Sequence, residues 1–210
     1  MSDNLKIETC ERLFNILSKG VPMLFEAANY VEKANRIIPN PAIIESRDVL
    51  SHIRDIALNS LDKENVNKNL VEIEQHIRRG IVETYQEHYE HLASNIFQTY
   101  GKYKQSFIRF ESLLRLRAKH APLHKNINQI LKSAQNAWME ARNLKNNDLD
   151  SPKLKMSIDK FKEASSLLSS IGEDVDAIFN DFYSRGIVTS FIFLFSLSLF
   201  VILLVKFFAL

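Results

Sequence analysis

The stretch VNKNLVEIEQHIRRGIVETYQEHYEHLASNIFQTYGKYKQSFIRFESLL, residues 66–114, decides the fold of this chain. Apolar residues recur along it about every 3.7 residues, close to the roughly 3.6 residues of a helical turn. This period exceeds the roughly 3.5 of a left-handed coiled coil, so it predicts a long helix packed in a bundle rather than a leucine zipper. The predicted stripe consists of Val66, Leu70, Ile73, Ile77, Ile81, Tyr85, Tyr89, Leu92, Ile96, Tyr100, Tyr103, Phe107, Phe110 and Leu114.

Glycine and proline divide the rest of the chain into further predicted helices. Gly20 and Pro22 separate the first two, and Pro122 marks a tight reversal, with the histidines beside it in the turn. Gly80 and Gly101 fall inside the long stripe, where each costs up to about 1 kcal/mol relative to alanine, so we expect the helix to bend there. The predicted helices cover residues 4–19, 22–37, 40–61, 62–120, 122–146 and 152–182.

Capping residues mark three of the helix starts. Asn40-Pro41 and Ser151-Pro152 are each a cap followed by a first-turn proline, and Asp62 is suited to cap the long helix. Between Asn40 and Asp62, the residues expected to form the buried stripe are Leu50, Ile53, Ala57 and Leu61. The chain is therefore expected to be all-α, an elongated bundle of about five to six helices.

Composition excludes several classes of protein. Only 5 Gly and 5 Pro occur among 210 residues, which argues against a turn-rich β-sandwich or a collagen-like repeat. With 46% hydrophobic residues the chain is not intrinsically disordered. A single cysteine, Cys10, cannot form an internal disulfide. The 27 basic and 25 acidic residues nearly balance, so no strong overall attraction to nucleic acid is expected.

Residues 187–205 contain no charged side chain and are almost entirely apolar. At about 1.5 Å per residue, such a helix approaches the roughly 30 Å thickness of the hydrocarbon core. The alternative, a buried core helix, is rarely uncharged over such a length. The first residues of the chain lack the apolar stretch of a secretory signal peptide. We therefore expect a cytosolic helical bundle over residues 1–186 and a C-terminal transmembrane anchor over residues 187–210.

Basic residues are concentrated in residues 101–145, a stretch that contains ten basic residues and only two acidic ones. They form either a solvated surface that contacts acidic helices of the same bundle, or a binding site for RNA or anionic headgroups. In the second interpretation the anion-binding residues are Arg78, Arg79, Lys102, Lys104, Arg109, Arg115, Arg117 and Lys119.

The spacing of the histidines matches no common metal-binding motif. His88 and His91 can share a helical face, with Glu87 and Glu90 beside them. Neither the Glu-x-x-His pairs of di-iron bundles nor a His-Glu-x-x-His motif occurs, and one cysteine cannot supply a thiolate cluster. The expectation from sequence is therefore no metal site and no cofactor.

One short motif carries possible chemistry. The segment Arg47-Asp48-Val49-Leu50-Ser51-His52 resembles the Arg-x4-6-His signature of the HEPN superfamily, which are helical bundles that include metal-independent ribonucleases. The resemblance implies that Arg47 stabilises phosphate charge, that Asp48 is the polar residue after the arginine, and that His52 acts as acid or base. Guanidinium groups do clamp phosphate oxygens, and imidazole titrates near neutrality.

The sequence thus predicts a single-pass, tail-anchored membrane protein whose cytosolic bundle is a protein-interaction or self-assembly module. Its partners are the bilayer, through residues 187–205, and a second copy or another protein, through the bundle. The alternative is a membrane-tethered HEPN-like ribonuclease of stress or phage defence, with RNA as substrate. The sequence leaves open whether the chain is an enzyme, and no small-molecule substrate is evident.

Overall fold

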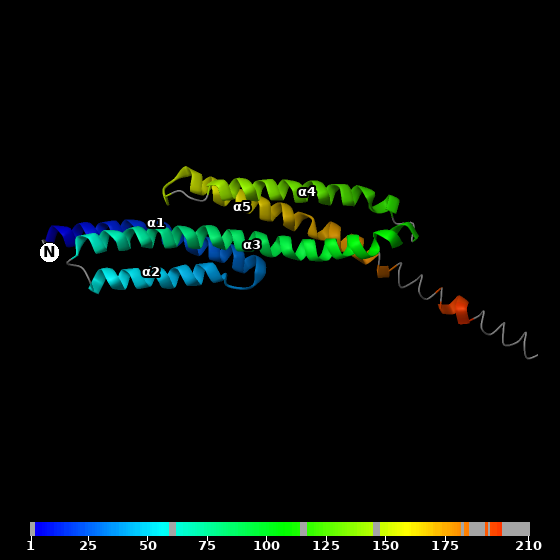
Figure 1. The fold of residues 1–210 in the computed structure, drawn as a ribbon, viewed down its shortest axis with the longest axis horizontal. Helices are drawn as coiled ribbons and strands as arrows, with labels where there is room; N and C mark the ends of the chain where they lie inside the picture. The colour runs from blue at the N-terminus through cyan, green and yellow to red at the C-terminus, as the bar shows by residue number, and fades with distance from the viewer. Residues whose placement is uncertain are drawn as a thin grey trace, which may run out of the picture. The chain divides into compact units, whose positions relative to one another are not determined.

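The computed structural model describes residues 3–58, 62–113, 117–144, 148–181, 183–184, 192 and 194–198, without the side chains of 3–5 and 102–118. Within these residues the regular structure is all helical, as predicted. The helices are α1 (Asp3–Asn35), α2 (Asn40–Leu58), α3 (Lys63–Leu113), α4 (Arg117–Leu144) and α5 (Pro152–Ser170), shown in Figure 1. Residues 172–181 are helical too.

Two compact units divide the chain. One consists of Met1–Ala93 and Ser133–Leu167, and the other of Ser94–Lys132 and Leu168–Leu210. The division falls within α3, α4 and α5, so each unit takes part of these three helices. The domain boundary expected after residue 186 lies outside the described residues.

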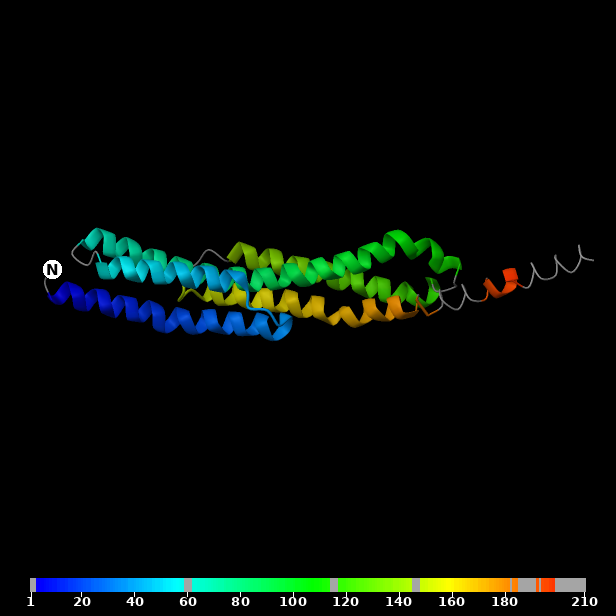
Figure 2. The same cartoon turned by 90° about the horizontal axis from the view of Figure 1, so that it is seen from below.

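In the first unit, α1, α2 and α3 lie side by side (Figures 1 and 2). Contacts of Arg12 with Asn67 and of Tyr30 with Tyr85 show that α1 and α3 run in the same direction, whereas α2 runs opposite to them. α5 runs alongside α1, as the ion pair between Glu26 and Lys162 indicates. The core of this unit is built on Val66, Leu70, Ile73, Ile77, Ile81, Tyr85, Leu154, Ile158 and Phe161, together with Leu24 and Ala27 of α1.

Two predicted caps are present. The carboxylate of Asp62 accepts hydrogen bonds from the backbone N–H groups of Glu64 and Asn65, at 3.0 and 3.2 Å, at the start of α3. The hydroxyl of Ser151 accepts one from the N–H of Lys153, at 3.2 Å, at the start of α5. These interactions involve only neighbouring residues, which is why the sequence was sufficient to predict them.

The predicted break at Gly20 and Pro22 is wrong, because α1 continues through both residues. A Cβ added at Gly20 would lie 2.6 Å from Cγ2 of Ile77, so the glycine allows α1 to approach α3 closely. Pro22 is exposed and removes one helical hydrogen bond. Burial of Leu24 and Ala27 directly after it offsets that local cost.

α3 likewise continues through Gly80 and Gly101. Gly80 is a packing residue, since an added Cβ would lie 2.9 Å from Cδ1 of Leu24 and 3.1 Å from Cβ of Glu45. No atom lies within 4 Å of the corresponding position at Gly101. Pro122 does not begin a helix: α4 already starts at Arg117, so the neighbouring histidines are helical rather than turn residues.

The face of α2 that is buried differs from the predicted stripe. Leu50, expected in the core, is 66% exposed, whereas Ala42, Glu45, Val49 and Ile56 are buried. The helix is therefore rotated relative to the prediction. In this rotation Glu45 packs against α3 next to Gly80, where an added Cβ would lie 3.1 Å from Cβ of Glu45.

The second unit pairs the end of α3 with the start of α4 and with residues 168–181. The hydroxyl of Tyr100 lies 2.8 Å from Nδ1 of His124, and the amide of Asn126 donates to Asp174 at 3.0 Å. Its buried apolar residues include Ile96, Ile127, Leu168, Ile171, Val175 and Ile178.

Among the described residues, no helix is both long enough and apolar enough to cross a bilayer. Most of the predicted anchor, residues 187–205, lies outside the described residues. The described part of it is Ile192 and residues 194–198, of which 194–198 are helical. The apolar side chains there are exposed: Ile192 62%, Leu194 58%, Phe195 72% and Leu197 48%.

Candidate functional site: a histidine cluster between α2 and α3

Two histidines from different helices meet in the first unit. His52 of α2 and His76 of α3 stack with their ring centroids 5.1 Å apart. Their Nε2 atoms face each other at 3.3 Å. Both side chains are half-buried, and that of His76 is 12% exposed. The pair is formed by packing alone, because the two residues are 24 positions apart in the sequence.

A buried carboxylate holds the far side of His76. Oε2 of Glu45 lies 2.5 Å from Nδ1 of His76, and the Glu45 side chain is only 7% exposed. The guanidinium of Arg79 lies 3.6 Å from Oε1 of the same carboxylate. Gly80 makes this arrangement possible, since any larger residue would push Cβ of Glu45 away from α3. A buried carboxylate with charged or hydrogen-bonded partners is far less costly than an isolated one.

An asparagine holds the far side of His52. Nδ1 of His52 lies 2.7 Å from Oδ1 of Asn69, which is buried. The amide nitrogen of Asn69 donates to the backbone carbonyl of Asn65 at 2.9 Å and to its side-chain oxygen at 2.8 Å. These two bonds fix which end of the amide faces His52.

Carboxylates surround the two rings in positions where a cation could be held. Ligand atoms of His52, Glu72 and His76 all lie within 4.8 Å of one another, and the same is true of Glu45, Asp48 and His76. This histidine cluster, made of His52, His76, Glu45, Asn69 and Glu72, is the densest group of chemically active side chains in the described part of the first unit.

Arg47 and His52 of the Arg-x4-6-His motif have different contact partners. The guanidinium of Arg47 is 75% exposed and is bound to the neighbouring carboxylate of Asp48, with Nη2 to Oδ1 at 3.0 Å. His52 is instead turned towards α3, where its two ring nitrogens contact Asn69 and His76. The structure therefore brings His52 into the histidine cluster and leaves Arg47 on the surface.

The predicted anion-binding residues are scattered. Arg78 is half-buried, and Arg79 faces Glu45. The side chain of Lys119 pairs with Asp181 of the second unit, which is one of the acidic residues near the predicted anchor. Arg115 lies outside the described residues, and the side chains of Lys102, Lys104, Arg109 and Arg117 are not described.

Asp181 also accepts a contact from buried His120, whose Nε2 lies 3.3 Å from Oδ2. Hydrogen bonds from Lys119 first, and from His120 second, lower the pKa of Asp181 below its ordinary value. Lys119, one of the basic residues of 101–145, thus has an acidic partner within its own unit.

Sequence reasoning missed Glu45, Asn69, Glu72 and His76. One signal was available: Glu45 and His52 occur at helical spacing with Ala42, Val49 and Ile56. Two polar residues on an otherwise apolar stripe indicate a buried polar interaction. The exposed Leu50 concealed this stripe, because it made the neighbouring face seem the apolar one.

No protein-family model matches the chain, and the searches of curated proteins and of solved structures find no match either.

Proposed function

We propose that the chain is a single-pass membrane protein, anchored by residues 187–205, whose helical part is a protein-interaction or self-assembly module beside the membrane. The observation that carries the proposal is the exposure of the apolar side chains described within residues 187–205. A helix in water buries such side chains against a core, whereas a helix in a bilayer exposes them to lipid.

One polar residue of the segment, Ser198, is compatible with lipid. The hydroxyl of Ser198 donates to the backbone carbonyl of Leu194 at 2.9 Å, so this polar group is satisfied within its own helix. In hydrocarbon every polar group needs such an internal partner, because no water is present to replace it.

Exposed apolar residues on α1 and α2 support the interaction module. Ile7 and Phe14 lie on the same side of α1, two turns apart, and are 57% and 73% exposed. On α2, Ile43 and Leu50 have the same spacing and are 53% and 66% exposed. Large apolar side chains that gather at the surface are typical of contact sites for other proteins.

The HEPN-like ribonuclease remains an alternative proposal with weaker support. Its mechanism needs Arg47 and His52 to face one phosphate, but Arg47 is bound to Asp48 and His52 is turned towards His76. No observation among the described residues favours it over the interaction module.

Membrane flotation of the full chain tests the anchor. The double variant Leu194→Arg/Phe195→Arg places two charges near the middle of residues 187–205, at a cost of about 2.5–3.5 kcal/mol each. We expect the wild-type chain to float with liposomes and to resist alkaline extraction, and the variant to lose most of its membrane-bound fraction.

The matched control is Ile7→Arg/Phe14→Arg on α1. These residues are 57% and 73% exposed, against 58% for Leu194 and 72% for Phe195, so both pairs add equal charge at equally exposed apolar positions. The control should float as the wild type does, and it should show reduced self-association or partner capture. A wild-type chain that stays in the supernatant, or equal loss in both variants, contradicts the anchor.

A further inference from the structure

We propose that His52, His76 and Glu72 bind a divalent transition-metal ion, with Zn²⁺ as the ion that the donor set suits best, and that the ion links α2 to α3. Two imidazoles and one carboxylate form a common three-residue set for zinc and for non-haem iron. The proposal is independent of the membrane anchor. It goes beyond the sequence analysis, which gave no reason to expect a metal site.

The tautomer of His52 follows from its asparagine partner. The amide nitrogen of Asn69 is occupied by two bonds to Asn65, so Oδ1 is the atom that faces His52. A carbonyl oxygen only accepts hydrogen bonds, and Nδ1 of His52 must therefore carry the proton. Consequently Nε2 of neutral His52 has a free lone pair.

The tautomer of His76 follows from its carboxylate partner. Oε2 of Glu45 lies 2.5 Å from Nδ1 of His76, and the guanidinium of Arg79 lies 3.6 Å from Oε1 of the same carboxylate. An ionised carboxylate only accepts, so Nδ1 of His76 is the donor. A carboxylate that orients a histidine in this way is the usual arrangement behind metal-binding imidazoles, and it makes the ring a stronger ligand.

In both neutral imidazoles the unprotonated nitrogen is therefore Nε2, the atom at which the two rings approach each other. Their Nε2 atoms are 3.3 Å apart, and two lone pairs at that distance repel unless a cation lies between or beside them. In a tetrahedral site with Zn–N bonds of about 2.0–2.1 Å, two nitrogen ligands are separated by about 3.3–3.4 Å. The observed separation matches this edge without any movement of the helices.

Glu72 supplies the third ligand. It precedes His76 by four residues on α3, so the two side chains lie on one face of the helix. A carboxylate oxygen of Glu72 lies within 4.8 Å of one ring nitrogen of His52 and of one ring nitrogen of His76. Three protein ligands leave the fourth tetrahedral position to a water molecule.

The competing occupant of the same point is a proton shared by the two rings. A proton bridge needs neither Glu72 nor any metal, and it forms only when one of the two imidazoles is charged. The two occupants are therefore distinguished by metal titration at a pH of about 7.5, where ordinary imidazoles are neutral.

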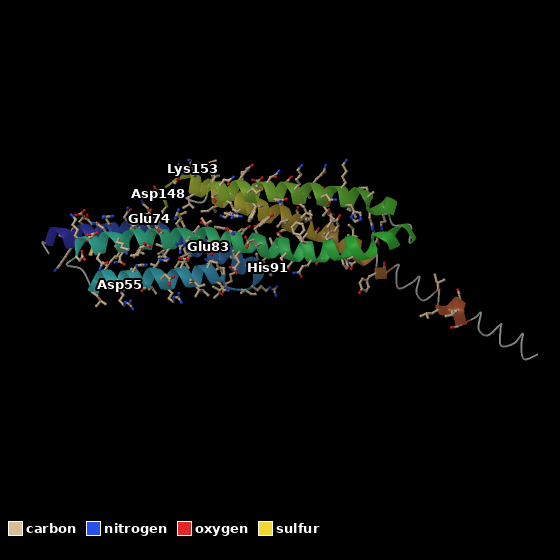
Figure 3. All side chains as sticks on the ribbon, viewed as in Figure 1. Asp55, Glu74, Glu83, His91, Asp148 and Lys153 are labelled. Atoms are coloured by element: carbon tan, nitrogen blue, oxygen red, sulfur yellow. The ribbon has the colours of Figure 1, made fainter. Side chains whose placement is uncertain are left out.

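Isothermal titration of Zn²⁺ into the full chain, in detergent and after treatment with a chelator, tests the proposal. We expect one equivalent to bind, and His52→Gln and His76→Gln to weaken binding by about 100-fold or more. His91→Gln is the matched control, since His91 is an exposed histidine on the same helix, labelled in Figure 3, and should leave the affinity unchanged. Co²⁺ should show the intense visible absorption of a four-coordinate ion.

Two conservative variants guard against misfolding, which far-UV circular dichroism monitors. Glu72→Gln keeps the shape of the side chain and should weaken zinc binding as strongly as loss of a histidine does. Glu45→Gln, which changes only the orienting partner, should weaken it by about 10–100-fold. Absence of zinc binding at micromolar concentration, or equal affinity of His52→Gln, His76→Gln and the wild type, overturns the proposal.

Discussion

Replacement of Gly20 by alanine should destabilise the protein, although alanine is the better helix former. The new Cβ would lie 2.6 Å from Cγ2 of Ile77 and 3.1 Å from Cδ1 of Leu149, well inside the roughly 3.5–4.0 Å of an ordinary carbon contact. Ile77 is 0% exposed and Leu149 8%, so neither side chain can retreat into solvent.

The expected free-energy change is a balance of two effects. Overpacking of a filled core costs about 1–3 kcal/mol, and an overlap of nearly 1 Å against buried atoms places Gly20→Ala in the upper part of that range. The gain in helix propensity is up to about 1 kcal/mol. The net loss is about 1–2 kcal/mol, which lowers Tm by roughly 2–8 °C in a chain of this size.

Thermal unfolding of the full chain in detergent, followed by far-UV circular dichroism, measures this change. Gly101→Ala is the control, because no atom lies within 4 Å of its Cβ position, and it should raise stability by about 0.5–1 kcal/mol. In an Ile77→Ala background both close contacts with Ile77 are gone and only the 3.1 Å contact with Leu149 is left, so Gly20→Ala should destabilise much less there than in the wild type. A Tm for Gly20→Ala equal to or above that of the wild type would refute the close contact between α1 and α3.

Three further predictions concern the titration of a buried ring, the histidine cluster and RNA. Burial lowers the pKa of His88, so on acidification the unfolded state takes up a proton before the folded state does. The free energy of unfolding should therefore decrease as the pH falls below about 6.5. His88→Leu should reduce this dependence on pH, as measured by urea unfolding with chelator present. An unchanged dependence on pH contradicts this assignment. Gly80→Ala should displace Glu45 and weaken zinc binding by about 10-fold in calorimetry, since the Cβ would lie 3.1 Å from Cβ of Glu45. The wild-type chain, incubated with mixed RNA, should cleave no more RNA than the Arg47→Ala and His52→Ala variants do. Cleavage by the wild type that both variants lose would support the ribonuclease instead.

The sequence alone determined the helical class and the positions of several helix ends. The stripe from Val66 to Tyr100 is buried, apart from the half-buried Leu92, and the caps at Asp62 and Ser151 are in place. These features are local, because a helix repeats its contacts every three to four residues and a cap binds the next two or three N–H groups. A single sequence contains all the information that such contacts need.

Tertiary structure decided which glycines lie at helix contacts and which side chains meet. Gly20 and Gly80 appear as breaks in the sequence, yet each permits a neighbouring helix to approach, and the cost of glycine is offset by the burial gained. The rotation of α2 carries Glu45 and His52 to α3, where His76 lies. The spacing of Glu45 and His52 on the buried stripe of α2 was a local signal for that rotation. It could not identify the partners on α3, because those residues lie far along the chain.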